Sequence, residues 1–317
     1  GAGLWGASIL SQTWVEPSSK QIVTAGGGAE TVNTHAAGAD ADVAVVMLAS
    51  SKVAGSRSTA AALQTLAKFG GWKGPVVLIS DNPRCVEMLR KQYPSVTAAL
   101  KVVSIARTQT FLGAEVQKAE VFKHMAAANV TAKTLIYLDP DVLVGAPIQQ
   151  LLDHIKQPAF AGEDLLMFSG AGRNASKLDT SVLVLRDTQV AKECLSEWSA
   201  EVAKRSGAGD PHAADLTHLQ EAWMATDCFK DGSITTLPAG WEQPGLFVEP
   251  DSASIAQGRR AVFMHFDVAK WKSDFQTVSK TKVKAEIGAY FNQVLGLEGD
   301  LFARSGCGAR QPLLAAR

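Results

Sequence analysis

The feature that most constrains the fold is a regular alternation between residues 43 and 138. Four apolar runs of strand length are separated by three stretches with helical periodicity. The expected strands are Val43–Leu48, Val76–Ile79, Leu100–Ile105 and Thr134–Leu138, and the expected helices are Ser58–Phe69, Pro83–Tyr93 and Ala114–Ala128. Alternation at this spacing is typical of right-handed βαβ units, whose parallel sheet is covered by helices on both faces. The sequence therefore predicts an α/β fold with a mostly parallel sheet.

The second half of the chain mixes strands and helices without regular alternation. The expected strands are Leu165–Phe168, Ser181–Leu185 and Ala261–His265, and the expected helices are Pro147–Ile155, Thr188–Lys204, Ala213–Thr226 and Lys280–Leu295. Residues 1–40 are rich in Gly, Ala, Ser and Thr and show no sustained period, which predicts an irregular lead-in. We expect a single domain over residues 41–300, followed by a tail over residues 301–317.

The charge balance excludes one class of partner. Lysine plus arginine and aspartate plus glutamate number 31 each, so the chain has no overall positive charge with which to attract nucleic acid or an anionic membrane. No apolar run reaches the ~18 residues that a membrane-spanning helix needs. The chain begins with a glycine, which is compatible with removal of an upstream targeting or anchoring segment. Attachment to a membrane is expected only through such a segment, which this chain lacks.

Cysteines and glycosylation motifs bear on the compartment. The four cysteines form no C-x-x-C pair, which argues against a structural zinc site or a thioredoxin-type motif and leaves their pairing open. Asn129-Val130-Thr131 and Asn174-Ala175-Ser176 are acceptor tripeptides for N-glycosylation, although such tripeptides also occur by chance in cytosolic proteins. They favour the Golgi or another secretory lumen, with the cytoplasm as the alternative.

The sharpest local signal for chemistry is the segment 134–144, TLIYLDPDVLV. A buried apolar strand runs directly into Asp139 and Asp141, and side chains two residues apart on an extended backbone share a face. Pro140 biases Asp139 toward an extended conformation and ends the strand at the carboxyl edge of the sheet, where open α/β sheets bind ligands. Two carboxylates at this edge predict a site for Mg²⁺ or Mn²⁺ bound to a phosphate group.

The alternative interpretation of Asp-Pro-Asp is a simple turn followed by a helix cap. A second D-x-D, Asp40-Ala41-Asp42, shows that the pattern can arise by chance. That copy precedes the first expected strand, whereas Asp139 and Asp141 leave the end of one. Position therefore favours the metal-binding interpretation for the pair at 139 and 141.

The motif resembles the D-x-D segment of glycosyltransferases with the glycosyltransferase A fold, and within them glycosyltransferase family 8 and its relatives. Three later segments follow in the family's order. LDTSVLVL at 178–185 is similar to the strand that frames the donor sugar, Leu219-Gln220-Glu221 resembles the D-Q-D/E step, and HFDVAKW at 265–271 resembles the closing motif. Together the similar segments lie within residues 43–272.

The resemblance implies both a fold and a reaction. The fold would be a single glycosyltransferase A domain with a Rossmann-like sheet, a nucleotide-binding half and an acceptor-binding half. The enzyme would move a sugar from a nucleotide-diphosphate donor to a hydroxyl group of a glycan, a glycoprotein or a small molecule, with retention of configuration. Mn²⁺ or Mg²⁺ on the diphosphate would stabilise the negative charge that develops on the leaving group.

The resemblance also implies roles for individual residues. Asp139 and Asp141 would bind the cation together with His265, although a histidine after an apolar run is otherwise more often a satisfied core residue. The remaining implied positions are Lys118 and Lys270 at the donor phosphates, Ser50 and Ser51 at the nucleoside, and Gln220 and Asp179 along the sugar face.

Departures from the family pattern leave two rival functions open. Asp179 stands where the family has Asn, and Leu219 replaces the first Asp of D-Q-D. These changes are compatible with a catalytically inactive scaffold that binds glycans or nucleotides. A sugar-phosphate nucleotidyltransferase would share the fold outline, but ASSKVAGSRS at 49–58 is a poor match to the Gly-rich loop of that class.

Overall fold

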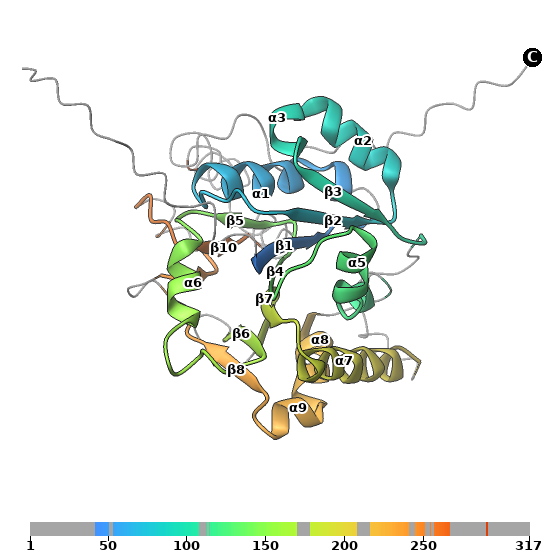
Figure 1. Ribbon diagram of the computed structural model, residues 1–317, viewed down its shortest axis with the longest axis vertical. Coiled ribbons are helices and arrows are strands. Elements are labelled where there is room, and N and C mark those ends of the chain that lie inside the picture. Colours follow the sequence, from blue (N-terminus) through green and yellow to red (C-terminus); the bar gives the residue numbers. More distant parts are fainter. Residues whose placement is uncertain are drawn as a thin grey trace, which may run out of the picture. The chain divides into compact units, whose positions relative to one another are not determined.

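Seven strands form the main sheet, in the order β3-β2-β1-β4-β7-β6-β8 (Figure 1). Their bounds are β1 Val43–Leu48, β2 Val76–Ser80, β3 Leu100–Ser104, β4 Thr134–Leu138, β6 Leu165–Ser169, β7 Leu178–Arg186 and β8 Ile234–Leu237. Strand β7 runs antiparallel to β4 and β6, and all the other neighbouring strands are parallel. The predicted α/β fold with a mostly parallel sheet is therefore confirmed.

The structure is a computed structural model, and it describes residues 42–50, 53–107, 113, 115–169, 178–207, 216–240, 245–250, 254, 257–266 and 290. All of these belong to the unit formed by residues 36–317. The predicted lead-in, the C-terminal tail and, apart from Tyr290, the closing helix lie outside the described residues. In the described part of the chain, no helix combines the length and the apolar character needed to cross a bilayer.

A second sheet of three strands has the order β5-β10-β9. Its bounds are β5 Val142–Val144, β9 Phe247–Val248 and β10 Phe263–His265. Strand β10 is antiparallel to β5 and parallel to β9. Because β5 follows β4 after only three residues, this small sheet lies at the carboxyl end of β4.

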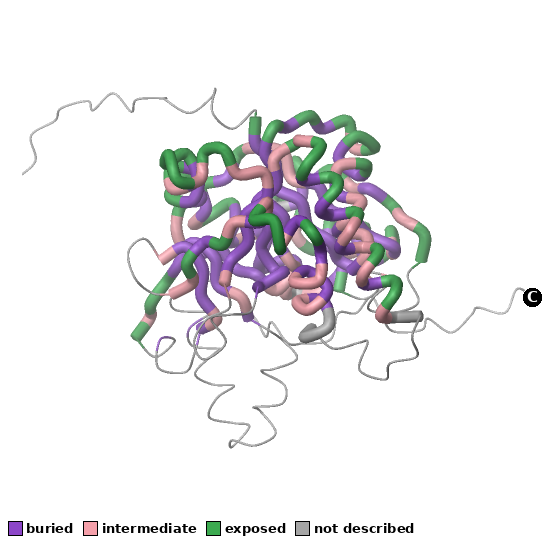
Figure 2. Tube along the Cα trace, turned by 90° about the horizontal axis from the view of Figure 1, so that it is seen from below, coloured by how far each residue is buried: buried purple, intermediate pink, exposed green. Residues whose placement is uncertain are grey.

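Helices cover the two faces of the main sheet (Figure 1). The longer ones are α1 Arg57–Lys68, α2 Pro83–Gln92, α5 Val121–Ala127, α6 Gln149–Ile155, α7 Gln189–Gly207 and α8 Leu216–Ala225, and the short ones are η2 Val53–Gly55, α3 Pro94–Thr97, η3 Val116–Lys118 and α9 Asp227–Lys230. Side chains of a strand alternate between its faces. Val45 accordingly packs in the cluster that contains α1, α2 and α6, whereas Val46 packs in the cluster of α5, α7 and α8. Figure 2 shows the buried residues concentrated inside these layers.

Local sequence signals explain where the first helices begin. The hydroxyl of Ser56 accepts a hydrogen bond from the backbone N–H of Thr59 at the start of α1. Asn82 caps α2 in the same way by accepting from the N–H of Cys85, and Pro83 occupies the first helical position, where a missing N–H costs nothing. Helices α1 and α2 therefore begin soon after β1 and β2 end, next to the carboxyl edge of the sheet.

Several elements differ from the sequence-based expectation. The predicted helix over 114–128 is divided into the short turn η3 and helix α5. Strand β7 begins at Leu178, three residues earlier than expected, and therefore includes Asp179. Strands β5, β8 and β9 were not predicted, because runs of two to four residues depend on pairing with neighbours more than on their own pattern.

Candidate active site

The candidate site lies at the carboxyl end of β4, where two strands from distant parts of the chain meet it. The N–H of Asp139 donates to the carbonyl oxygen of Ser181 at 2.8 Å, which extends the pairing of β4 with β7 by one residue. Because β7 is antiparallel to β4, the beginning of β7 lies at the end of β4. The topology thus brings Asp179 to the D-x-D segment.

The second sheet brings in the histidine. In the pairing of β10 with β5, His265 lies opposite Val142, directly after Asp141. The N–H of Phe266 then donates to the carbonyl oxygen of Asp141 at 3.1 Å. Nε2 of His265 is 3.7 Å from Oδ1 of Asp141, so the structure brings together two of the residues that were predicted to bind a cation.

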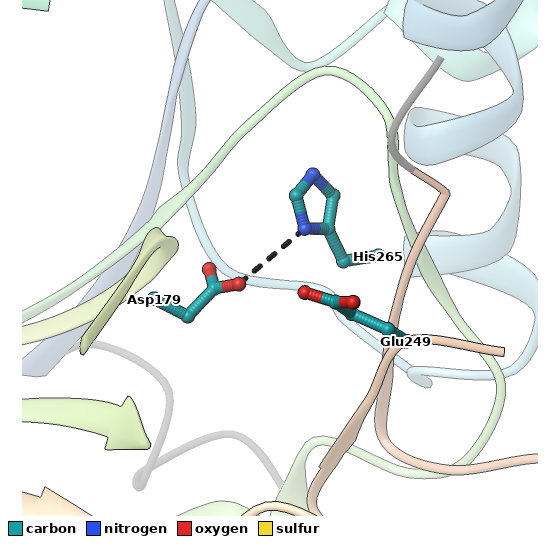
Figure 3. A group of neighbouring side chains, drawn as sticks. All are labelled: Asp179, Glu249 and His265. Atoms are coloured by element: carbon teal, nitrogen blue, oxygen red, sulfur yellow. Dashed lines mark ion pairs between the residues drawn. The ribbon is translucent and has the colours of Figure 1, made fainter. Parts of the chain in front are cut away.

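Glu249 joins the same group, and the sequence analysis missed it. It follows β9, whose last residue Val248 pairs with Met264 of β10, so one further step in register sets Glu249 opposite His265. Potential ligand atoms of Asp179, Glu249 and His265 all lie within 4.8 Å of one another. Figure 3 shows the two carboxylates and the imidazole ring gathered around one small region. The available signal was weak, because Glu249 ends an apolar run, Leu246–Val248, of only three residues.

The group fits a divalent cation by its chemistry. Carboxylate oxygens suit Mg²⁺ and Mn²⁺, and an imidazole nitrogen suits Mn²⁺ better than Mg²⁺. Two of the predicted ligands, Asp141 and His265, lie side by side, with Asp141 next to Nε2 of the imidazole ring. Asp179 lies next to Nδ1 of the same ring, and Glu249 adds a third carboxylate to the group. The residues present could therefore hold a cation against a phosphate group.

Asp139 is engaged by protein groups. Its Oδ1 accepts a hydrogen bond from the hydroxyl of Tyr137 at 2.6 Å and lies 3.0 Å from Nζ of Lys118. Its Oδ2 is 3.3 Å from the same ammonium. These partners fix the orientation of the Asp139 carboxylate, whose side chain keeps 20% of its surface exposed.

Asp179 is held at both of its oxygens. Its Oδ1 accepts hydrogen bonds from the backbone N–H of Ser181, at 2.7 Å, and from the hydroxyl of the same residue. Its Oδ2 lies 3.5 Å from Nδ1 of His265. Asp179 is buried and was predicted to line the sugar face; in the structure it contacts His265.

The charges within the group shift the pKa values of its members. Burial alone would lower the pKa of His265, but the carboxylates of Asp179, Asp141 and Asp139 raise it to about 10. Burial would raise the pKa of Asp179, but the charge of His265 and the hydrogen bonds from Ser181 leave it below its ordinary value. Without a cation, His265 is therefore protonated at neutral pH and compensates part of the negative charge.

Lys118 is 1% exposed, although it was predicted to contact the donor. Burial would lower its pKa, but Asp139 and Glu115 raise it above the ordinary value. Burial raises the pKa of Glu115 to about 7, against the opposing effect of Lys118. The ammonium of Lys118 contacts Glu115, Asp139 and the carbonyl oxygen of Thr180.

Four further residues were predicted to contact the donor, namely Ser50, Ser51, Gln220 and Lys270. Ser50 lies at the end of β1 and is partly buried, as expected for a position at the carboxyl edge. Ser51 and Lys270 lie outside the described residues. Gln220 lies on α8, which packs beside β7, and within the described part of the chain no hydrogen bond joins it to Asp139, Asp179 or His265.

No protein-family model matches the chain, and no curated protein matches it. Solved structures do resemble it. The galactosyltransferase LgtC, solved in complex with donor and acceptor sugar analogues, is 10% identical, with 75% of this chain and 95% of LgtC covered and a TM-score of 0.47. GlyE from Streptococcus pneumoniae TIGR4 is 16% identical over 73% of this chain, with a TM-score of 0.42. Both are glycosyltransferases.

The chain spans about half the length of GlyE, since 50% of that protein is covered. At these identities the likeness concerns the fold. The function is therefore inferred from the residues at the carboxyl end of β4.

Proposed function

We propose that the protein is a metal-dependent glycosyltransferase of the glycosyltransferase A type, which moves a sugar from a nucleoside-diphosphate donor to a hydroxyl acceptor. The observation that carries the proposal is the meeting of Asp141, Asp179, Glu249 and His265 at the carboxyl end of β4. The first and the last of these residues are 124 positions apart in the chain. A mixed carboxylate and imidazole group at the ligand-binding edge of an α/β sheet suits a cation that carries a diphosphate.

The chain's own residues would divide the work as follows. Asp141 and His265 would hold the cation, and Asp139 would face it from the orientation set by Tyr137 and Lys118. Mn²⁺ or Mg²⁺, when bound, would act as a Lewis acid toward the departing diphosphate. Asp179 would keep the His265 ring in place through Nδ1, as a carboxylate beside a metal-bound histidine does.

Retention of configuration is part of the proposal and follows from the motif resemblance. The acceptor would be a glycan, a glycoprotein or a small molecule. We also propose a secretory lumen as the site of action. The disulfide between Cys194 and Cys228 and the exposed sequon residue Asn129 support an oxidising compartment.

A donor screen tests the proposal without knowledge of the acceptor. Purified protein is incubated with UDP- and GDP-sugars, with Mn²⁺, with Mg²⁺ or with EDTA, and slow transfer to water is followed by NMR. We expect hydrolysis of at least one donor that EDTA abolishes, with the first-formed sugar keeping its anomeric configuration. D141N should lower the rate by a factor of about 100 or more. D153N, which changes an exposed aspartate on α6, should leave the rate unchanged.

Three other outcomes would contradict parts of the proposal. Inversion at the anomeric carbon would refute retention only. Release of pyrophosphate from a nucleoside triphosphate and a sugar 1-phosphate would identify a nucleotidyltransferase instead. Cation-dependent binding of UDP or GDP by calorimetry, without turnover of any donor or acceptor, would favour the inactive scaffold.

A further inference from the structure

Lys118 carries a buried charge that no step of the proposed reaction uses directly. Its Nζ lies 2.6 Å from Oε2 of Glu115 and 3.0 Å from Oδ1 of Asp139. The same ammonium lies 5.0 Å from the centre of the Tyr137 ring, over its face. A buried ammonium is tolerated only when its charge is paired and its hydrogen bonds are made, so this geometry requires both carboxylates.

The local backbone brings Glu115 and Lys118 together. Glu115 precedes the short turn η3 with helical backbone, and Lys118 is the last residue of η3. Side chains three residues apart on helical backbone are neighbours, and these two residues have that spacing. Both side chains therefore lie close to the end of β4, where Lys118 contacts Asp139.

The contacts of Lys118 affect how strongly Asp139 can attract a cation. Lys118 alone would neutralise Asp139 and weaken its attraction for a divalent ion. The carboxyl group of Glu115 contacts the same ammonium, at 2.6 Å, so Lys118 is shared between Glu115 and Asp139 rather than held by Asp139 alone. The side chain of Glu115 is 11% exposed and that of Lys118 is 1% exposed, so the contact between them is largely shielded from water.

We propose that Glu115 is a positioning residue for the cation site, which acts through Lys118 by holding the ammonium in place, so that Asp139 stays oriented and available to the cation. This inference rests on the proposed function, because it assumes that a cation binds at the D-x-D segment. Glu115 touches neither the cation nor the donor in this role. Its effect must therefore depend on the presence of Lys118.

The test is a cycle of variants, E115Q, K118M and the double variant, each compared with the wild-type protein. The Mn²⁺ dissociation constant is measured by electron paramagnetic resonance and calorimetry in the presence of UDP. Groups that orient metal ligands change metal affinity by about 10- to 100-fold when mutated, so E115Q should weaken Mn²⁺ binding by at least about tenfold. In the K118M background the same change should have an effect of less than about twofold. The apparent KM for Mn²⁺ in donor hydrolysis should follow the dissociation constant, with a smaller change in kcat.

The matched control is E120Q. Glu120 pairs with Lys123 at the same spacing and at 2.8 Å, but the two side chains are 44% and 78% exposed. Losing that pair should leave Mn²⁺ binding at the wild-type value. Thermal unfolding of each variant shows whether the fold is kept.

Each outcome decides the inference. Wild-type affinity in E115Q would overturn it, and so would an E115Q change that weakens Mn²⁺ binding as much in the K118M background as in the wild-type protein, since Glu115 would then act without Lys118. If E115Q does not fold, the double variant is compared with K118M, and any further loss of Mn²⁺ affinity overturns the inference. Failure of the wild-type protein to bind Mn²⁺ at all would refute the proposed function first and this inference with it.

Discussion

Nδ1 of His265 lies 3.5 Å from Oδ2 of Asp179, and this ion pair connects β10, the central strand of the small sheet, to the first residues of β7. The two residues are 86 positions apart in the chain and both lie next to the D-x-D segment. Because Asp179 and the neighbouring carboxylates raise the pKa of His265 to about 10, the ring is charged at neutral pH unless a cation replaces its proton.

Binding of Mn²⁺ should release close to one proton per ion at pH 7.5, because a metal takes the neutral imidazole. The apparent affinity should therefore increase as the pH rises from about 6.5 toward 10, by up to about tenfold per unit. Calorimetry in two buffers with different ionisation enthalpies measures the released protons. Binding without proton release would show that His265 is not a ligand, and H265N serves as the reference without a titrating ring.

The stability of the cation-free protein should have the opposite pH dependence. The folded pKa of His265, about 10, lies above its ordinary value of 6.5, so the ion pair stabilises fully below pH 6.5 and is lost as the pH rises toward 10. D179N should flatten this part of the stability curve and lower stability at pH 6.5 by about 1–3 kcal/mol. Urea unfolding between pH 6 and 10 measures both, and parallel curves for the two proteins would contradict the prediction.

Replacement of Asp139 and replacement of Asp141 should have different effects on stability. D139N leaves the buried ammonium of Lys118 with only Glu115 as an ionic partner, so we expect a loss of about 1–3 kcal/mol in the free energy of unfolding. D141N, at a residue whose side chain is 25% exposed, should change stability by less than about 1 kcal/mol. Urea unfolding compares the two variants, and equal losses would contradict the pairing described for Lys118.

Gly145 should be required for the position of His265. A Cβ atom at Gly145 would lie 2.6 Å from the carbonyl oxygen of Ala261 and 2.7 Å from Cε of Met264, so the chain leading into β10 would have to move. We expect G145A to weaken Mn²⁺ binding at least about fivefold and to destabilise the protein by about 1–3 kcal/mol, as overpacking does. G162A is the control, because nothing lies within 4 Å of its added Cβ atom. Similar Mn²⁺ affinities for the two variants would refute the prediction.

The disulfide between Cys194 on α7 and Cys228 on α9 should stabilise the protein without affecting the site. It closes a separation of 34 residues, and bridges of this kind contribute about 2–4 kcal/mol. Replacing both cysteines by alanine should lower the free energy of unfolding by that amount while the Mn²⁺ affinity stays within about twofold. Urea unfolding and calorimetry measure the two quantities, and a large loss of affinity would show that the bridge supports the site as well.

The first half of the fold could be predicted from the sequence because its elements carry strong local signals. Val43–Leu48 and Thr134–Leu138 are continuous apolar runs that are buried along their whole length, and the observed strands have the predicted bounds. The capping residues Ser56 and Asn82 likewise act over three residues. Local patterns of this kind identify an element without knowledge of its neighbours.

Part of the candidate site could be predicted for the same reason. Asp139 and Asp141 follow a strand, and their position predicted the edge of the sheet at which they lie. The association of His265 with Asp141 came from a resemblance, because nothing within the local sequence links residues 124 positions apart. Glu249 was missed because the two-residue strand before it exists only through its pairing with β10.

The amino-acid sequence by itself thus determined the alternating strands, the class of the sheet and the D-x-D segment at its edge, since these depend on the order of side chains along a short stretch. Only the tertiary structure decided that Asp179 pairs with His265, that Glu249 joins them and that Lys118 is buried between Glu115 and Asp139. The physical reason is that strand register and the compensation of buried charge are set between segments far apart in the chain, where no local pattern records the partner.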